Sequence, residues 1–303
     1  MATTFDQLVR QVRQQLLGFA MNQESVSFLT VAMLAGDTTF QVDGDSIANL
    51  SRGLVEIDDE LILTKKWDQS SGTVTVMAGV NGRGYEGTTA TTHAVNTLIT
   101  SNPAFPKTRI KEAINQTIQC LYPELVVFAS TEITKLAPVV EYALPADLSD
   151  VWYVTAQLTG PSQIWQPLPN WRYNPKADTT VFPSGKSLQV LDAVTPGRAI
   201  RIVYAKPPTL LVSGSDVFDV TTGYPDRYVD MVVFGTCMRL LPSLESARLQ
   251  LQSVETTERA PLVPPQSAAK AMAMYAQLYQ TRLAEEREQL FSDVPNYAMF
   301  QGS

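Results

Sequence analysis

The chain has 303 residues, of which 45% are hydrophobic and 17% are charged, so it can bury a sizeable core and lacks the composition of a disordered protein. Its net charge of −7 and its pI near 4.9 argue against nucleic-acid binding through a broad basic surface. An acidic chain can still surround DNA, because a passage of this charge does not hold phosphates.

The first residues, MATTFDQLVRQVRQQ, are amphipathic and charged, and we expect no secretory signal peptide there. The apolar run SVSFLTVAMLAG is shorter than the roughly 20 residues that a helix needs to cross a bilayer. Cys120 and Cys237 lie far apart, both in stretches with a helical pattern. We therefore predict two reduced, buried thiols.

Helical and extended patterns alternate along the chain. Apolar residues at helical spacing predict a helix over residues 4–17, and residues 25–100 contain short extended segments separated by turn signals. The helical period returns over residues 107–121 and ends at Pro123. A second extended region, rich in Pro, Gly and Asn, runs from residue 125 to residue 213.

The C-terminal part of the chain is predicted to be mainly helical. Residues 224–252 indicate a long helix that is interrupted near Pro242, and VETTERAPLVPP indicates a linker. Residues 266–290 predict a strong final helix, which a short aromatic tail follows. Arg282 and Glu286 are four residues apart near the end of this helix, a spacing that is typical of a solvated face.

These patterns predict an α+β fold, a helical bundle with two inserted all-β units and a long C-terminal helix. Separate helices scattered among β domains would give the same order of elements. The expected organisation is helical-bundle segments at 1–24 and 101–124, a small inserted β domain at 25–100, a second β domain at 125–222, a bundle helix at 223–255, and a Pro-rich elbow, C-terminal helix and docking tail at 256–303.

The stretch VNGRGYEGTTATTHA, residues 80–94, combines three glycines with the single histidine of the chain. It lacks the GK[ST] ending of a P-loop, and an extended segment rather than a helix follows it, so we do not expect it to bind phosphate. We interpret its glycines as turn residues that allow positive φ. His93 has no reactive nucleophile in a recognisable motif, and we predict that it anchors the loop through a hydrogen bond.

The acidic run Glu56-Ile57-Asp58-Asp59-Glu60 could supply paired carboxylates for a metal ion or for acid–base catalysis. It lies between two apolar strand segments, where such residues commonly form hairpin turns, and we favour the turn. No second cluster completes a metal site, and no close pair of His or Cys ligands indicates zinc. We expect no catalytic residue, no cofactor and no metal.

Two aromatic features allow more than one interpretation. The segment WQPLPNWRYNPK, residues 165–176, could stack on bases or sugars, but we favour internal packing or a protein–protein contact. The Met and Tyr residues of the final helix indicate core or interface. Because this helix follows a Pro-rich elbow near the end of the chain, it suits docking onto another subunit.

Residues 56–125 resemble a segment that recurs in virion proteins of tailed bacteriophages. The matching motifs are Asp58-Asp59-Glu60, Arg83-Gly84 with Gly87-Thr88-Thr89-Ala90 and His93-Ala94, Asn102-Pro103 with Phe105-Pro106, and Leu121-Tyr122-Pro123. The later segments LPADLSDVWYV and PGRAIRIVYAKPP, followed by helices that end in YQTRLAEEREQL, are similar in layout to head-to-tail connector (adaptor) proteins.

This resemblance implies a structural virion protein and no enzyme. It implies a ring, usually of twelve subunits, that joins the portal protein to a tail or nozzle protein at the head–tail interface. Double-stranded DNA would pass through the ring without specific binding during genome ejection, and no membrane would be involved. Before assembly the protein would be in the host cytoplasm.

The resemblance also implies a C-terminal segment that docks on the portal. The candidate docking residues are Met272, Tyr275, Leu278, Tyr279, Leu283, Tyr297 and Phe300. Candidate contacts in the β loops are Arg83, Tyr85, Trp165 and Trp171.

Two other functions stay open at the level of the sequence. The protein could be a tail or baseplate component whose β domains bind a host-surface glycan or neighbouring tail proteins through Trp165, Trp171 and Tyr173. It could also be a hydrolase that uses Asp58 or Glu60.

Overall fold

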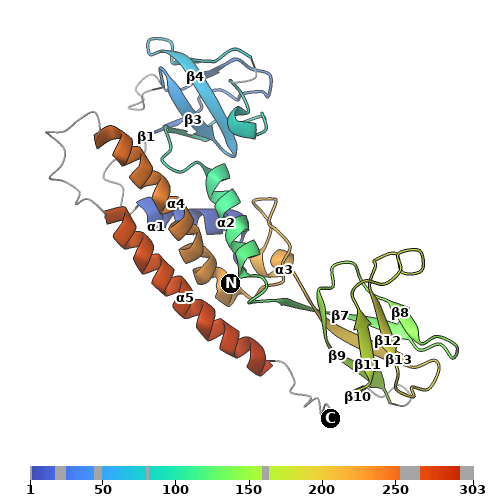
Figure 1. Ribbon diagram of the computed structural model, residues 1–303. Helices are drawn as coiled ribbons and strands as arrows, with labels where there is room; N and C mark the ends of the chain where they lie inside the picture. Colours follow the sequence, from blue (N-terminus) through green and yellow to red (C-terminus); the bar gives the residue numbers. More distant parts are fainter. Residues whose placement is uncertain are drawn as a thin grey trace. The chain divides into compact units, whose positions relative to one another are not determined.

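The computed structural model describes residues 2–17, 25–43, 50–79, 82–158, 164–252 and 267–293 (Figure 1). Helix and strand contribute nearly equally, at 31% and 30%, with 13 strands in three antiparallel sheets among these residues. The predicted helical bundle with inserted β units is therefore wrong. The strands build two apolar cores of their own and are as large a part of the fold as the helices.

The helices and short 3-10 turns follow the chain in this order: α1 (Phe5–Leu17), η1 (Tyr85–Gly87), α2 (Lys107–Leu121), α3 (Phe218–Thr222), η2 (Asp226–Tyr228), α4 (Val229–Gln252) and α5 (Ser267–Asp293). The first six strands are β1 (Ser25–Phe28), β2 (Thr39–Gln41), β3 (Gly53–Ile57), β4 (Glu60–Asp68), β5 (Thr73–Val76) and β6 (Leu98–Ser101). The others are β7 (Val127–Thr134), β8 (Glu141–Ala143), β9 (Asp150–Gln157), β10 (Trp165–Pro167), β11 (Trp171–Asn174), β12 (Ser187–Val190) and β13 (Ala199–Lys206).

The chain divides into two compact units. The barrel unit comprises Asp6–Asn115 and Val232–Ala276. The sandwich unit comprises Met1–Phe5, Gln116–Met231 and Gln277–Ser303. Helices α1, α2, α4 and α5 contribute residues to both units.

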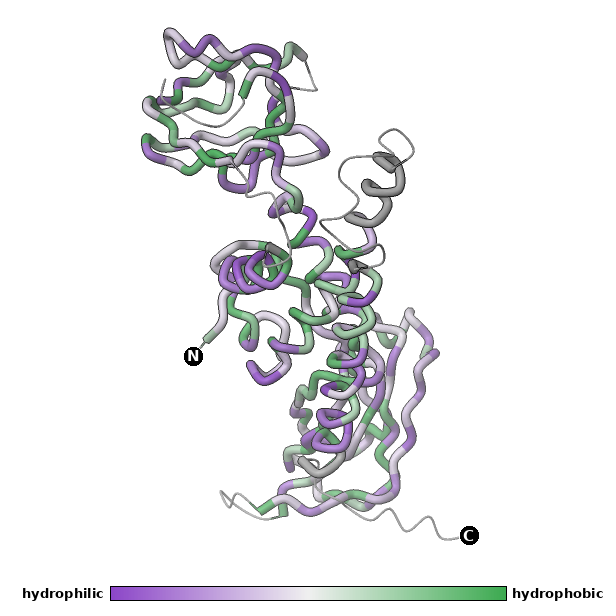
Figure 2. Tube along the Cα trace, turned by 90° about the vertical axis from the view of Figure 1, so that its left-hand side faces the viewer, coloured by the Kyte–Doolittle hydropathy of each residue, from purple (hydrophilic) through white to green (hydrophobic). Residues whose placement is uncertain are grey.

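The sheet of the barrel unit has the strand order β1-β6-β3-β4-β5-β2. Its two edges meet where Leu29 bridges Val42 and where the amide of Thr30 donates to the carbonyl of Gln41, so the sheet nearly closes on itself. Figure 2 shows hydrophobic and hydrophilic residues following one another along these strands. The inward side chains form a core of Leu29, Met33, Phe40, Val42, Leu50, Val55, Ile57, Ile62, Val74, Val76 and Ile99.

The hairpin predicted at the acidic run is confirmed. Strand β3 ends at Ile57, β4 begins at Glu60, and the two pair in antiparallel register. Asp58 in the turn has a φ of 53°, a left-handed conformation that Asp tolerates better than most residues.

The sandwich unit packs a four-stranded sheet, β10-β9-β13-β7, against a three-stranded sheet, β11-β12-β8. Strands of both sheets contribute to one core, as expected for two sheets packed face to face. Its buried residues are Tyr142, Leu144, Leu148, Val151, Val154, Ala156, Leu168, Leu188, Val190, Ile200, Ile202 and Tyr204.

The helix predictions hold except in α4, which begins at Val229 rather than at residue 224 and is preceded by η2. Helix α2 has the predicted bounds, and α1 and α5 differ from theirs by one to three residues. The interruption predicted at Pro242 is wrong, because α4 continues through this residue to Gln252. The predicted linker VETTERAPLVPP, residues 254–265, lies outside the described residues.

The two cysteines differ in burial. The prediction of a buried thiol is wrong for Cys120 and confirmed for Cys237. Cys120 is exposed on α2, where the neighbouring Ile118 and Leu121 take the buried positions. Cys237 is buried in α4, and burial raises the pKa of its thiol to about 12. Among the described helices, none combines the length and the apolar character that crossing a bilayer requires.

Candidate functional site

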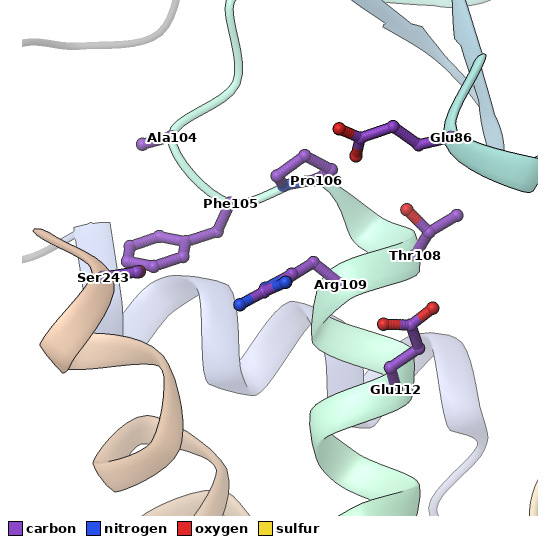
Figure 3. A pocket seen from close by; sticks show the side chains of 8 residues that line it. All are labelled: Glu86, Ala104, Phe105, Pro106, Thr108, Arg109, Glu112 and Ser243. Atoms are coloured by element: carbon purple, nitrogen blue, oxygen red, sulfur yellow. The ribbon is translucent and has the colours of Figure 1, made fainter. Parts of the chain in front are cut away.

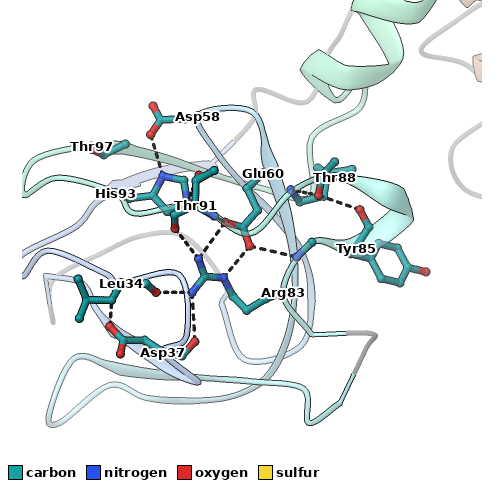
Figure 4. Close-up of polar contacts among 12 residues, drawn as sticks. Leu34, Asp37, Asp58, Glu60, Arg83, Tyr85, Thr88, Thr91, His93 and Thr97 are labelled. Carbon is teal, nitrogen blue, oxygen red and sulfur yellow. Dashed lines mark hydrogen bonds and ion pairs between the residues drawn. The ribbon is translucent and has the colours of Figure 1, made fainter.

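The glycine-rich loop after β5 is held by the buried carboxylate of Glu60 (Figure 4). Arg83 binds it with both ends of its guanidinium, with Nε 2.6 Å from Oε1 and Nη2 2.9 Å from Oε2. The amides of Gly84 and Thr91 each donate to the same carboxylate at 3.0 Å. Burial raises the pKa of Glu60, but the hydrogen bonds from Arg83, His93 and the two amides outweigh it and lower the pKa to about 2.

Arg83 is occupied within the barrel unit. Besides Glu60, its guanidinium donates to the carbonyl oxygens of Leu34 at 2.8 Å, Asp37 at 3.1 Å and Thr91 at 2.7 Å. Its side chain is only 10% exposed. The residue therefore joins three segments of the barrel unit.

The glycines serve the turn that we predicted. Gly84 has a φ of 63°, and a Cβ at this position would lie 2.6 Å from the carbonyl oxygen of Thr88. Tyr85 is half-buried in η1, and its carbonyl accepts a hydrogen bond of 2.9 Å from the Thr88 hydroxyl. The same hydroxyl accepts from the amide of Leu61 at 3.1 Å, which ties the turn to β4.

His93 anchors the loop through hydrogen bonds, as predicted. Its buried ring has Nδ1 2.8 Å from Oδ2 of Asp58 and Nε2 2.9 Å from Oε2 of Glu60. The two ring nitrogens face opposite ways, so these carboxylates and the ring do not converge on one ion. No group of three or more His, Cys, Asp or Glu among the described residues could hold a metal.

Glu56 links the barrel sheet to two helices, a role that we did not predict from the sequence. It is 3% exposed and accepts a hydrogen bond of 2.9 Å from Arg13 of α1. It also accepts one of 2.8 Å from the amide of Lys107, the first residue of α2. The preceding residue, Pro106, has no side-chain acceptor for the helix, so the capping carboxylate comes from β3. The absence of a capping side chain just before α2 was the sequence signal that a carboxylate from elsewhere caps this helix.

The remaining acid of the run is also paired. Asp59 accepts from Lys111 of α2 at 2.8 Å, and the same Lys111 lies 3.5 Å from Asp6 of α1. Each of the four carboxylates between residues 56 and 60 therefore has a basic partner of its own. The run joins the parts of the barrel unit rather than forming one acidic pair.

A shallow cleft of about 240 Å³ lies where α2 begins (Figure 3). Arg109 and the carboxylates of Glu86 and Glu112 line it together. Since Arg109 and Glu112 are exposed to solvent and the charges are of mixed sign, the cleft favours no particular ligand. Its other lining residues are Ala104, Phe105, Pro106, Thr108 and Ser243.

Three of the predicted portal-docking residues are buried by the chain itself: Tyr275, Tyr279 and Leu283. The ring of Tyr275 lies 6.1 Å from that of Phe234 in α4. Its hydroxyl donates to Oε1 of Gln15 at 3.2 Å. These side chains therefore support α5 within the chain.

The other docking candidates differ in their accessibility. Leu278 is 40% exposed, whereas Met272 is half-buried. Tyr297 and Phe300 lie outside the described residues. Leu278 is thus the described candidate that presents the most apolar surface to a partner.

Glu286 of α5 is 2% exposed, so the solvated face predicted for it is wrong. Arg282 reaches its Oε1 at 2.8 Å, as the i,i+4 spacing suggested. Arg227 of η2 binds the other oxygen, with its Nε 2.7 Å from Oε2. The contact with Arg227 attaches the C-terminal half of α5 to η2 within the sandwich unit.

The tryptophans of the sandwich are engaged internally. The guanidinium of Arg201 lies 4.0 Å from the ring centroid of Trp165 and also pairs with Glu132. Trp171 and Tyr173 pack against the sandwich core, which supports the packing interpretation of this segment.

A comparison with family models matches residues 89–297 to the SU10 adaptor protein family. The match spans more than two thirds of the chain and includes α2, strands β7 to β13, α4 and α5. Most of the barrel sheet lies before it. No match to a curated protein was found. The chain therefore belongs to the SU10 adaptor protein family, in agreement with its resemblance to bacteriophage head-to-tail adaptors.

Proposed function

We propose that this protein is a head-to-tail adaptor that joins the portal to the tail as a ring and forms part of the DNA passage. The observation that carries the proposal is the family match over residues 89–297. The ring binds the portal on one side and a tail or nozzle protein on the other. It is a component of the virion, assembled in the host cytoplasm.

The charge of the chain supports a passage that does not hold DNA. With a net charge of −7, the protein has more acidic than basic side chains, which disfavours binding of the phosphate backbone. Tight contacts between basic side chains and phosphates would slow the movement of DNA through a ring.

The carboxylates of the barrel unit support a structural rather than a catalytic role. Asp58, an acid suggested for a hydrolase, lies 2.8 Å from the His93 ring. Glu60 accepts two hydrogen bonds from Arg83 and one each from the amides of Gly84 and Thr91, and it lies 2.9 Å from Nε2 of His93. A general base must lie within reach of the substrate proton that it accepts. Glu60 has no exposed surface and cannot be reached in this way.

We propose that docking on the portal uses the exposed face of α5 at Leu278 together with the tail residues Tyr297 and Phe300. Glu286 holds the helix in place, so α5 itself need not become ordered when the partner binds. The buried residues Tyr275, Tyr279 and Leu283 contribute by supporting the helix.

Electron microscopy of the purified protein, with and without its portal, tests the proposal. We expect a ring of density on the portal. A chain truncated after Asp293, which lacks Tyr297 and Phe300, should lose most of this binding, and Leu278→Asp should weaken it. The matched control is Gln277→Asp, which adds the same charge at the adjacent exposed position. Absence of the ring from the wild-type mixture, or full binding by both altered chains, would count against the proposal.

A further inference from the structure

The barrel unit exposes one apolar, uncharged face on the ribbon formed by residues 25–34 and 94–101. Phe28 and Leu98 are cross-strand partners, both about half exposed. Val26 precedes Phe28 on the same side of β1, and the ladder continues beyond Leu29 to the bridge between Met33 and His93. Five apolar residues along this ribbon are each 46% to 52% exposed: Val26, Phe28, Val31, Val95 and Leu98.

This ribbon face contains no Asp, Glu, Lys or Arg. Its buried counterparts, such as Leu29 and Ile99, already fill the barrel core, so the exposed side chains are not needed for the fold of the unit. Contiguous apolar surface of this kind on a folded protein generally marks a contact with another protein.

The sandwich unit has a second apolar surface, at the end of the sandwich where β7 and β9 finish and β10 and β13 begin. The strand register places Thr134 beside Ala199 and Gln157 beside Trp165 at this end. Five apolar residues of the adjoining loops are each 46% to 62% exposed to solvent: Leu136, Val140, Leu158, Ile164 and Leu191. We call this end the sandwich tip.

Charged groups near the sandwich tip are largely satisfied by their neighbours. Lys135 donates to the carbonyl of Val139 at 2.8 Å, and Asp192 accepts from the amide and the side chain of Asn170. The loops that carry these residues are joined, since the amide of Lys135 donates to the carbonyl of Arg198. The tip is therefore a preorganised surface without excess negative charge.

We propose that the ribbon face of one copy of this chain binds the sandwich tip of the next copy. Two chains of net charge −7 repel each other, so they meet most favourably where negative charge is absent. The two surfaces are unlike and lie in different units, and a contact between unlike surfaces repeats from copy to copy and can close a ring. The inference rests on the proposed function, because a ring needs such a head-to-tail contact.

Sedimentation velocity over a concentration series up to about 100 µM tests this contact, since weak contacts are populated in that range. The variants are Phe28→Asp in the ribbon face and Leu191→Asp in the sandwich tip. Matched controls add the same charge elsewhere, with Thr39→Asp on β2 of the barrel and Val181→Asp, an exposed apolar residue of the loop between β11 and β12. Circular dichroism verifies that all four variants are folded.

We expect the wild type and both controls to self-associate with rising concentration and each variant alone to associate at least about tenfold more weakly. An equimolar mixture of the two variants should form a heterodimer and nothing larger, because each retains one intact surface. A wild type that stays monomeric, an unchanged single variant or a mixture that stays monomeric would overturn the inference. Portal binding by electron microscopy is measured separately, so a ring on the portal without this contact leaves the proposed function intact.

Discussion

Glu60 and Arg83 form a two-point ion pair inside the barrel unit, with the guanidinium Nε 2.6 Å and Nη2 2.9 Å from the two carboxylate oxygens. The glutamate is fully buried and the arginine is almost so. The pair places the glycine-rich loop against β4, and several measurable consequences arise from its geometry.

Arg83→Ala should lower the free energy of unfolding by about 3–5 kcal/mol, because it leaves the buried Glu60 carboxylate without its main partner. Arg83→Lys should recover only part of this loss, since an ammonium cannot bind both carboxylate oxygens and three carbonyls in the same way. Urea denaturation measures both values. A loss below about 1 kcal/mol for the alanine variant would show that the pair adds little to stability.

Acid should destabilise the protein partly through Glu60. Its pKa is lowered to about 2 in the folded chain, whereas an unfolded Glu has a pKa of about 4.3. The stabilisation is therefore present above the unfolded pKa and is lost as the pH falls through the folded pKa. Glu60→Gln should be less stable at pH 7 and should show a smaller decrease in stability between about pH 5 and pH 2.

The control for this pH dependence is Glu86→Gln, which changes an exposed glutamate of the same loop. Urea denaturation at a series of pH values should give the control the same pH profile as the wild type. Identical profiles for Glu60→Gln and the wild type would contradict the assignment.

Glu56→Ala should destabilise the barrel unit by about 3 kcal/mol or more, since it leaves Arg13 without its carboxylate and removes the cap of α2. The matched variant Glu112→Ala removes an exposed carboxylate of α2 and should change stability by no more than about 0.5 kcal/mol. Thermal or urea denaturation compares the two. Equal effects would mean that Glu56 has no special role.

Adjacent glutamates of α5 should behave differently. Glu286→Ala removes the buried partner of both Arg227 and Arg282, and we expect a loss of about 3 kcal/mol. Glu285 forms an exposed pair with Arg282, and its alanine variant should lose no more than about 1 kcal/mol. If denaturation gave the two variants the same stability, the burial of Glu286 would not contribute to the attachment of α5.

Local patterns predicted several elements correctly. The turn at Asp58, the bounds of α2 and the glycine turn follow from residues close in sequence. Backbone preference, capping and apolar periodicity act over a few residues, so a short stretch contains the necessary information. The family resemblance likewise came from short motifs, and the family match agrees with it.

The sequence by itself thus determined where turns and helices form and which family the chain belongs to. Only the tertiary structure decided that the strands form two cores of their own, that Cys120 is exposed and that Glu286 is buried. It also decided that Glu56 pairs with Arg13 across 43 residues and that Glu286 pairs with Arg227 across 59. The physical reason is that burial and ion pairing depend on which distant segments pack together, and periodicity along one segment does not specify its partner.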